Sequence, residues 1–354
     1  MGNRRKAQQD YRLPSRKQSL GLSLLELYGC DFQHFSLSTV ELPSKMVKFF
    51  SWLVGLHLAA ATIVNGYAAP GKCSGICTNA HDPSIIQSAN GTYYRFSTGN
   101  KIAVHSAPDI TGPWKYEGAA LPDGSSINLK GKDDLWVGDF YYLYYSVSSF
   151  GTQNSAIGVA RSTSLDVGTW EDGGSTTITS DSSKPYNAID PNLIEADGGY
   201  YLTFGSYWQG IHQAHMRDPP LVSSSAPVQI GFTSNYEVLE GPFIFHHGDF
   251  YYLFMSKGKC CGYDKSKPAA GKEYRILVCR SSKATGGFVD KEEVDCTKDG
   301  GTVVLESHDN VYGPGGQGVY DDPKLGPILY YHYGKCVYVV FLSMMIDCCA
   351  RSRS

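Results

Sequence analysis

The sequence predicts an all-β protein, a five-bladed β-propeller whose second blade and C-terminal closure are incomplete. Paired tyrosines recur at intervals of 48, 59, 51 and 79 residues, at Tyr93-Tyr94, Tyr141-Tyr142, Tyr200-Tyr201, Tyr251-Tyr252 and Tyr330-Tyr331. Several pairs stand in similar phrases, "GTYYRFST", "GDFYYLYYS", "GGYYLTFGS" and "GDFYYLFMS". A glycine turn followed by aromatic and small residues is typical of a hairpin entering a strand, and repeats of about 50 residues with four strands are typical of propeller blades.

The composition agrees with a β-rich globular protein and excludes one class of partner. Among 354 residues, 25 are Tyr and 39 are Gly, which suits pleated strands joined by tight turns. Charged residues make up 18%, the formal net charge is -3, and no stripe of Lys and Arg crosses the body of the chain. We therefore expect no nucleic-acid partner.

The N-terminal part precedes the predicted propeller. Residues 1–45 are polar and basic and form an atypical extension, which an artefact of the gene model would explain if translation starts at Met46. Residues 46–69, "MVKFFSWLVGLHLAAATIVNGYAA", have one Lys, an apolar run and small residues at the end, as in a secretory signal peptide. We expect a secreted, extracellular protein without stable membrane association. A signal anchor, if translation starts at Met1, and a buried core segment are the alternatives.

Residues 70–333 form the predicted propeller. Three acidic residues in it lie at nearly the same distance in sequence before a tyrosine pair. Asp82 precedes Tyr93 by 11 residues, Asp190 precedes Tyr200 by 10, and Glu240 precedes Tyr251 by 11. They stand in related phrases, "HDPSII", "IDPNLI" and "EGPFIF", with Pro just ahead of an apolar strand. Because Pro is tolerated at the first residue of a strand, each acid is placed at a strand mouth, and equal offsets predict that the three converge. Taken singly, each could instead be a turn carboxylate.

Three converging carboxylates are suited to glycoside hydrolysis. One protonates the leaving oxygen, a second activates water, and a third can raise the pKa of the acid by like-charge repulsion. Spacing alone does not distribute these roles.

The phrases "HDPSII", "YNAIDPNLI" and "EGPFIFHHGDFYYLF", with "KCCGYD", "KEYRILVCRSS" and "GPGGQGVYDDP", resemble glycoside hydrolase family 43, most closely its fungal endo-1,5-α-L-arabinanases. The similarity runs from about Cys77 to Tyr333 and implies a monomeric five-bladed propeller that cleaves arabinan or arabino-oligosaccharides with inversion and needs no cofactor for the chemistry. The resemblance implies these roles: Asp82 general base, Glu240 general acid, Asp190 pKa modulator, Trp136, Asn187 and Ser206 substrate contacts. It also implies that His332 helps to hold a structural cation, often calcium, in the central channel, although a lone His in an aromatic strand is as well explained as core.

Two segments depart from the family pattern. In "DDLWVGDFYYLYYS" only four residues separate Trp136 from Tyr141, so we expect the inner strand of the second blade to be missing or rebuilt, which affects the Trp136 subsite. Residues 334–354 form an apolar, cysteine-rich tail in place of closing strands. A ring left open exposes sheet edges, so the chain as printed is expected to fold poorly.

Cysteines and one sequon add smaller predictions. Six cysteines of the body fit disulfides or free thiols better than a zinc site, with the pairing left open: Cys73, Cys77, Cys260, Cys261, Cys279 and Cys296. Asn90 of "NGT" is an N-glycosylation acceptor if the chain is exported.

Other functions remain open at this level. A non-catalytic arabinan-binding propeller or decayed enzyme would fit the two departures, although all three acids are retained. An exo-acting arabinofuranosidase or β-xylosidase of the same family would use the same chemistry with different loops at the ends of the cleft.

Overall fold

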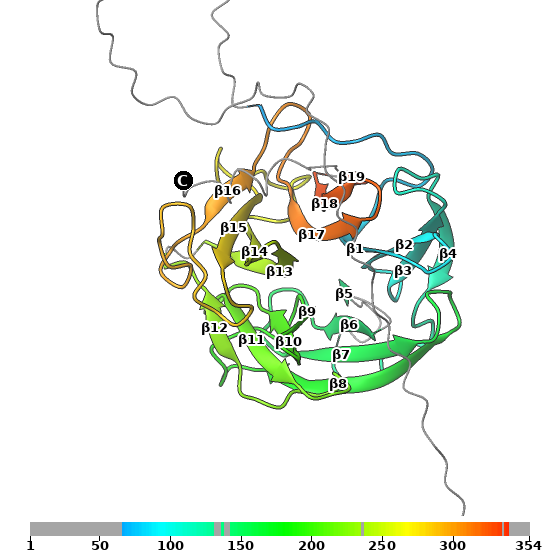
Figure 1. Cartoon of the computed structure of the whole chain (residues 1–354), viewed down its shortest axis with the longest axis horizontal. Helices are drawn as coiled ribbons and strands as arrows, with labels where there is room; N and C mark the ends of the chain where they lie inside the picture. The colour runs from blue at the N-terminus through cyan, green and yellow to red at the C-terminus, as the bar shows by residue number, and fades with distance from the viewer. Residues whose placement is uncertain (1–65, 131–135, 138–141, 235–236, 335, 340–354) are drawn as a thin grey trace, which may run out of the picture. The chain divides into compact units, whose positions relative to one another are not determined.

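The computed structural model describes residues 66–130, 136–137, 142–234, 237–334 and 336–339. These residues form antiparallel sheets, four of them with four strands and one with three, and in each sheet the strands pair in chain order (Figure 1). The expectation of an all-β propeller is confirmed. Within the described ranges, no helix is long and apolar enough to cross a membrane.

The first two sheets come from residues 81–180. The first contains β1 (His81–Gln87), β2 (Tyr93–Thr98), β3 (Ala103–Ala107) and β4 (Lys115–Ala119). The second contains β5 (Trp136–Val137), β6 (Tyr142–Val147), β7 (Ser155–Ser162) and β8 (Trp170–Ser180).

The remaining sheets follow in the same meander order. The third contains β9 (Asn192–Ala196), β10 (Gly199–Phe204), β11 (Ile211–Met216) and β12 (Val228–Gly231). The fourth contains β13 (Leu239–His247), β14 (Phe250–Lys257), β15 (Arg275–Ser281) and β16 (Thr302–Leu305). The last contains β17 (Gly315–Asp322), β18 (Gly326–Tyr333) and β19 (Cys336–Val339).

The first strand of each sheet lies innermost, so the sheets are arranged around the strands β1, β5, β9, β13 and β17 (Figure 1). Strand β1 contacts β5 and β17, and β13 contacts β9 and β17. The beginnings of several inner strands therefore meet near one axis, which places the acids of the sequence phrases within reach of one another.

The core lies between the sheets. Each of five apolar clusters combines residues of two sheets. Because successive side chains of a strand point to opposite faces of its sheet, each sheet can pack against both of its neighbouring sheets. Tyr144 of β6 packs with Phe204 of β10, for example, while Tyr93 of β2 packs with Tyr330 of β18. The last of these clusters contains residues of the first sheet and of the last sheet, so these two sheets share buried apolar side chains.

The second sheet has the inner strand that the sequence left in doubt. Strand β5 is present but only two residues long, and it pairs Trp136 with Ser146 and Val137 with Tyr145. The departure from the family pattern therefore takes the form of a short inner strand rather than a missing one. Residues 131–135 and 138–141 on either side lie outside the described residues.

The last sheet has three strands in the described part of the chain. Strand β19 pairs with β18 from Tyr333↔Cys336 to Tyr330↔Val339, so the first residues of the predicted divergent tail extend the sheet. The rest of the tail (340–354), the N-terminal extension (1–45) and most of the predicted signal peptide (46–65) lie outside the described residues.

All six body cysteines are paired. The disulfides join Cys73 to Cys77, Cys260 to Cys261 and Cys279 to Cys296. The preference for disulfides or thiols over zinc ligands agrees with this pairing, which the sequence had left open.

Candidate active site

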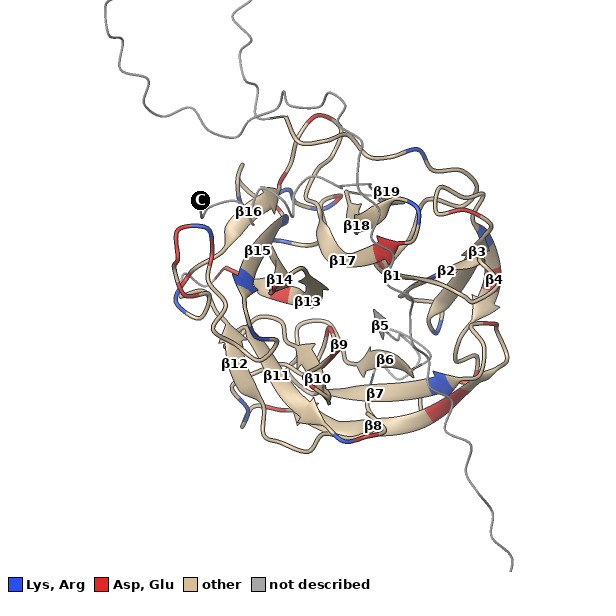
Figure 2. Cartoon of the chain, viewed as in Figure 1, with Lys and Arg blue, Asp and Glu red and all other residues tan. Residues whose placement is uncertain are grey.

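The three phased acids lie at the mouths of inner strands, as the repeat predicts. Asp82 is the second residue of β1, Asp190 lies two residues before β9, and Glu240 is the second residue of β13. All three are partly buried. Figure 2 shows acidic segments (red) both on inner strands and on the outer parts of the sheets.

Irregular backbone turns these side chains toward one another. The pairing register shifts after His81 in β1 and after Glu240 in β13, as it does in a β-bulge. Asp82 and Asp190 have φ angles of 43° and 57°, a left-handed conformation that Asp adopts more readily than most residues. Bulges at strand ends commonly redirect side chains beside functional sites, and here the irregularities lie at the residues that carry Asp82 and Glu240.

Hydrogen bonds between sheets hold the acids in place. Ser206 Oγ donates to Glu240 Oε2 at 2.7 Å, and Gly241 N donates to Asp190 Oδ2 at 3.1 Å. Asp190 N in turn donates to Ser146 Oγ of β6 at 3.2 Å. The second, third and fourth sheets are thus joined through residues of the acid cluster.

Asp82 lies in a group of two histidines and a threonine. His81 Nδ1 is 2.6 Å from Asp82 Oδ2, and Thr98 Oγ1 donates to the same oxygen at 3.4 Å. Asp82 N is 3.3 Å from His332 Nδ1, and the rings of His81 and His332 stack with centroids 4.3 Å apart.

Gly316 makes this arrangement possible. A Cβ atom at Gly316 would lie 2.4 Å from Asp82 Oδ1 and 2.5 Å from His332 Nδ1, and its φ angle is 57°. Only glycine combines that conformation with so close an approach. Part of the "GPGGQG" phrase is therefore a tight packing element behind Asp82.

The acids differ in protonation. Burial of Asp82 pushes its pKa upward, but the charge and hydrogen bond of neighbouring His81, together with His332 and Thr98, outweigh burial and lower the pKa to about 2. The pKa of Glu240 is raised by burial, despite hydrogen bonds from Ser206 and Tyr274 that lower it. The pKa of Asp190 is raised well above its ordinary value by burial and by the nearby charges of Glu240 and Asp82. The site therefore combines one carboxyl group whose pKa is lowered with two whose pKa values are raised.

The histidines differ in the same way. The charge of Asp82 raises the pKa of His81 to about 9, so His81 is a cation over most of the pH range. Burial lowers the pKa of His332 to about 3, so that ring is neutral.

The other predicted site residues are placed unequally. Ser206 touches Glu240 directly. Asn187 is buried, and its Oδ1 accepts hydrogen bonds from Ser155 Oγ at 2.7 Å and Ser180 Oγ at 3.3 Å, within the fold. The backbone of Trp136 pairs with Ser146, but its side chain lies outside what the structure describes. Asn90 is exposed in the turn between β1 and β2.

Two residues of the site were not singled out from the sequence. His81 directly precedes Asp82 in "HDPSII", so its position in the phrase was a usable signal. Tyr274 hydrogen-bonds Glu240 and stacks on His332 with ring centroids 5.8 Å apart. Tyr274 belongs to the family phrase "KEYRILVCRSS", but no spacing rule connects it to the acids.

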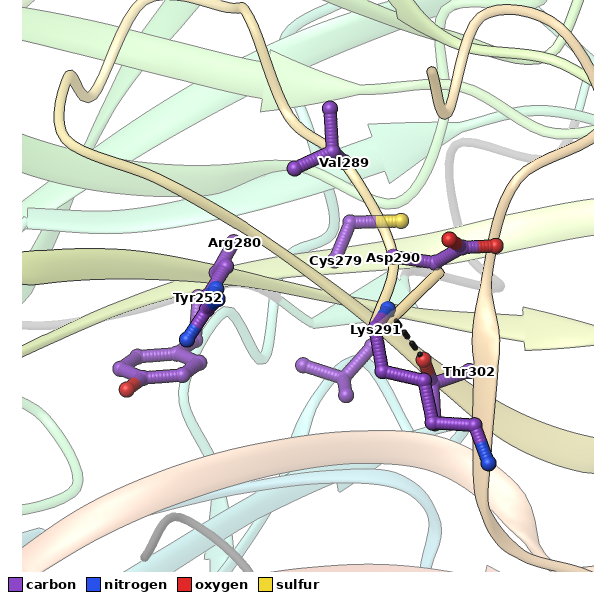
Figure 3. Close-up of a pocket in the computed structure, with 8 residues that line it drawn as sticks. Tyr252, Cys279, Arg280, Val289, Asp290, Lys291 and Thr302 are labelled. Atoms are coloured by element: carbon purple, nitrogen blue, oxygen red, sulfur yellow. Dashed lines mark hydrogen bonds between the residues drawn. The ribbon is translucent and has the colours of Figure 1, made fainter. Parts of the chain in front are cut away.

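A small pocket elsewhere contains none of these residues (Figure 3). It is lined by Tyr252, Val278, Cys279, Arg280, Val289, Asp290, Lys291 and Thr302. Asp290 accepts hydrogen bonds from the backbone of Glu292, Val294 and Gly301. Lys291 N donates to Thr302 Oγ1 at 2.9 Å, the dashed line in Figure 3. Because these polar groups stabilise a turn, the acid cluster rather than this pocket is the candidate site.

A propeller with three carboxyl groups at the mouths of its inner strands, one with a lowered pKa and two with raised pKa values, is typical of the propeller-type glycoside hydrolases. Comparison with known proteins specifies the family. The model of glycosyl hydrolases family 43 matches residues 76–341. The chain belongs to this family and is an enzyme.

Relatives with more than half of their aligned residues identical to this chain are found in fungi. The probable arabinan endo-1,5-α-L-arabinosidase A of Emericella nidulans is 58% identical over 280 residues, which cover 77% of this chain and 87% of the relative. The arabinan endo-1,5-α-L-arabinosidase A of Aspergillus niger is 57% identical over 281 residues, with the same coverage. Both alignments span most of either protein, so the similarity is not confined to a motif.

Solved structures with the same fold are more distant in sequence. The α-L-arabinanase of Cellvibrio cellulosa aligns with a TM-score of 0.64 and 28% identity over 73% of this chain and 90% of that chain. The family 43 endo-arabinanase of Bacillus licheniformis aligns with a TM-score of 0.64 and 29% identity over 77% of this chain and 94% of that chain.

Proposed function

We propose that this enzyme is an endo-1,5-α-L-arabinanase that hydrolyses internal bonds of arabinan with inversion of configuration. The observation that carries the proposal is the contrast between Asp82, whose pKa is lowered to about 2, and Glu240, whose pKa is raised. An inverting glycosidase needs one ionised carboxylate and one protonated carboxyl group in the same site. The substrate assignment is supported by the names of the fungal relatives and by a Cellvibrio cellulosa α-L-arabinanase complexed with arabinohexaose, at TM-score 0.62 and 28% identity.

The proposed reaction is a single displacement. Asp82 accepts a proton from a water molecule, whose oxygen attacks the anomeric carbon. Glu240 donates its proton to the glycosidic oxygen as the bond from that oxygen to the anomeric carbon breaks. The leaving chain departs as a neutral alcohol, and the new reducing end has the opposite anomeric configuration.

Asp190 is proposed to keep Glu240 protonated. Its carboxyl group accepts a hydrogen bond from the backbone of Gly241, the residue after the acid, and the charge of Glu240 raises the pKa of Asp190. Because repulsion between two carboxylates is reciprocal, an ionised Asp190 disfavours ionisation of Glu240. Asp190 is therefore a positioning residue that acts through Glu240.

The site chemistry is tested by Asp82→Asn and Glu240→Gln. Each is expected to lower kcat on linear 1,5-arabinan about 10²- to 10⁴-fold, the usual contribution of a general acid or base. Of the two variants, only Glu240→Gln should regain activity on a dinitrophenyl arabinoside, because the dinitrophenolate leaving group needs no proton. A wild-type enzyme that binds arabino-oligosaccharides in calorimetry and releases no product over days would instead be the non-catalytic propeller.

Exo action is the second candidate, because an exo-1,5-α-L-arabinanase from a bovine ruminal metagenomic library aligns with a TM-score of 0.64 and 27% identity. An endo enzyme produces a broad set of intermediate oligosaccharides early in the digestion of arabinan. An exo enzyme releases one short product from the start. Chromatography of early digests decides between them, and cleavage of short xylosides alone would exclude arabinan as the substrate.

We also propose that the five sheets are the five blades of a closed ring. Support comes from the apolar clusters, each shared by two sheets, including the cluster that joins β2 with β18. A shortened C-terminus ending at residue 335 removes β19 and should lower the unfolding temperature if the last sheet completes the ring.

Export and assembly are proposed from the sequence. The predicted signal peptide (46–69) supports secretion, and exposed Asn90 supports N-glycosylation in the secretory pathway. A mature N-terminus near residue 70 and a glycan on Asn90, both visible by mass spectrometry of culture medium, are expected. We propose a monomer, which light scattering tests.

We propose a structural cation near His332, by family resemblance a calcium ion, and the hydrolysis itself needs no cofactor. The residues fit such an ion: His332 is buried, its Nε2 has no partner among described residues, and ligating atoms of His81, Asp82 and His332 lie within 4.8 Å of one another. Because Asp82 N donates to Nδ1 of neutral His332, the hydrogen of that ring lies on Nε2, so His332 would contact the ion through a hydrogen bond from Nε2 to a water molecule of its shell. The ion would supply positive charge beside Asp82 and connect inner strands.

A further inference from the structure

The loop 205–210, which joins β10 to β11, presents two aromatic rings to solvent. The side chains of Tyr207 and Trp208 are 51% and 41% exposed, and their ring centroids are 5.8 Å apart in an edge-on arrangement. A single exposed aromatic residue needs no explanation. Two adjacent exposed rings, however, form an apolar patch on the surface, and such patches often mark binding sites.

Their backbone is strained. Tyr207 and Trp208 have φ angles of 60° and 41°, in the left-handed region that bulky residues rarely adopt. Such strain persists only where the surroundings impose it, and it concentrates at functional sites.

The surroundings of this loop do impose it. Tyr207 N donates to Leu239 O at 3.2 Å, Gln209 N to Pro185 O at 3.0 Å, and Gly210 N to Tyr207 O at 2.7 Å. A Cβ atom at Gly205 would lie 2.3 Å from Gly210 O, so the two ends of the loop are in close contact. The rings are therefore held outward by a rigid loop.

The loop adjoins the acid cluster. The register of β9 with β10 pairs Asn192 with Thr203, which brings the end of β10 beside Asp190. Ser206, the residue before the two rings, forms an isolated antiparallel bridge with Glu240 and donates its hydroxyl hydrogen to the Glu240 carboxyl group. The platform formed by Tyr207 and Trp208 thus starts one residue from a direct contact of the proposed acid.

We propose that Tyr207 and Trp208 form a sugar-binding platform for the arabinofuranose units on the leaving-group side of the bond that is cut. This inference rests on the proposed function, in which Glu240 protonates the leaving oxygen, so the units attached to that oxygen lie on the side of Glu240. A neutral furanose chain offers C–H faces, which pack on aromatic rings without any charged partner. The link of the platform to Glu240, through Ser206, rather than to Asp82 determines the side.

The test removes each ring without disturbing the loop. Asn tolerates the left-handed conformation, so Tyr207→Asn and Trp208→Asn keep the backbone and delete the rings. The control is Tyr116→Asn, because Tyr116 is 49% exposed but lies on β4, the outer strand of the first sheet. Two substrates are compared: linear 1,5-arabinan, and α-1,5-arabinotriosyl fluoride, which has no sugar on the leaving side.

The expected result is a fall in the ratio of kcat/KM for arabinan to kcat/KM for the fluoride. Each platform variant should lower this ratio about 3- to 10-fold, the effect of one lost ring contact, and Trp208→Phe should restore most of it. Tyr116→Asn should leave the ratio at the wild-type value. An unchanged ratio in both platform variants, or equal losses on both substrates, would overturn the proposal.

Failure of the proposed function gives a different pattern. If the wild-type enzyme cuts neither substrate, calorimetry with arabinohexaose replaces kinetics. Weaker binding by the variant with both rings deleted then supports the platform, and binding equal to wild type overturns it.

Discussion

The Nδ1 atom of His81 lies 2.6 Å from Oδ2 of Asp82, and this contact favours the ionised form of a partly buried carboxylate. Burial alone would raise the pKa of Asp82, whereas the charge and hydrogen bond of His81, with smaller contributions from His332 and Thr98, lower it to about 2. Since the pKa of His81 is raised to about 9, its charge is present throughout the acidic range in which Asp82 must act as a base.

His81→Gln is therefore predicted to shift the acidic limb of kcat/KM to higher pH. Without the neighbouring cation, burial dominates and the pKa of Asp82 rises, so the base becomes protonated at a pH where the wild-type enzyme is active. The measurement is kcat/KM on arabinan between about pH 2.5 and 7.

Thr98→Val is the control for this shift. It removes the longer 3.4 Å contact to the same oxygen and should move the limb in the same direction by less. An acidic limb that stays in place in His81→Gln, with the fold intact by circular dichroism, would contradict this role of His81.

Tyr274→Phe is predicted to move the alkaline limb to higher pH. The hydroxyl of Tyr274 hydrogen-bonds Glu240 and favours its ionised form, so removal of the hydroxyl raises the pKa of Glu240 further. The acid then keeps its proton at higher pH, as a pH profile of kcat/KM would record.

Asp190→Asn should move the same limb in the opposite direction. The substitution removes a carboxyl group whose charge disfavours ionisation of Glu240, while the amide oxygen can still accept the hydrogen bond from Gly241. If both variants shift the limb the same way, the alkaline limb does not report Glu240.

Gly316→Ala is predicted to lower kcat/KM about 100-fold. The new Cβ atom would come within 2.5 Å of both Asp82 and His332, and displacement of a catalytic group by an ångström can cost that much activity. The matched control is Gly326→Ala. Gly326 also has a left-handed φ, 73°, but has open space around it, so it should lower stability by about 1–2 kcal/mol without the loss of activity. Equal activity of the two variants would show that Gly316 does not position Asp82.

Calcium is predicted to stabilise the folded enzyme through His332. After treatment with EDTA, added CaCl₂ should raise the unfolding temperature of the wild-type protein, because an ion that binds only the native state stabilises it. His332→Gln should not respond. A wild-type protein whose unfolding temperature is independent of calcium has no such site.

The sequence predicted the convergence of the acids because a repeat converts equal offsets into equivalent positions. Asp82, Asp190 and Glu240 follow that rule. The signs of their pKa shifts depend instead on partners from other parts of the chain. Tyr274 directly precedes β15, and Ser206 follows the end of β10. No offset within a blade relates these residues to Glu240, so their contacts with Glu240 could be found only from the structure.

The repeat also could not predict the local backbone conformation. A pattern of alternating residues cannot show that Tyr207 and Trp208 adopt left-handed φ angles, or that β5 keeps two residues where the inner strand was expected to be missing or rebuilt. Asn187, expected to contact substrate, has its side-chain oxygen bonded to two serines within the fold, and its contact with substrate stays a prediction.

The central claim, that Asp82 and Glu240 hydrolyse arabinan by a single displacement, is tested most directly by proton NMR of the first turnovers. Linear 1,5-arabinan or arabinohexaose is mixed with enzyme, and the anomeric signals of the new reducing ends are followed before mutarotation equalises them. Our account predicts that the β-anomer appears first. Initial release of the α-anomer would mean retention through a covalent intermediate and would contradict the assignment of Asp82 as a base acting on water.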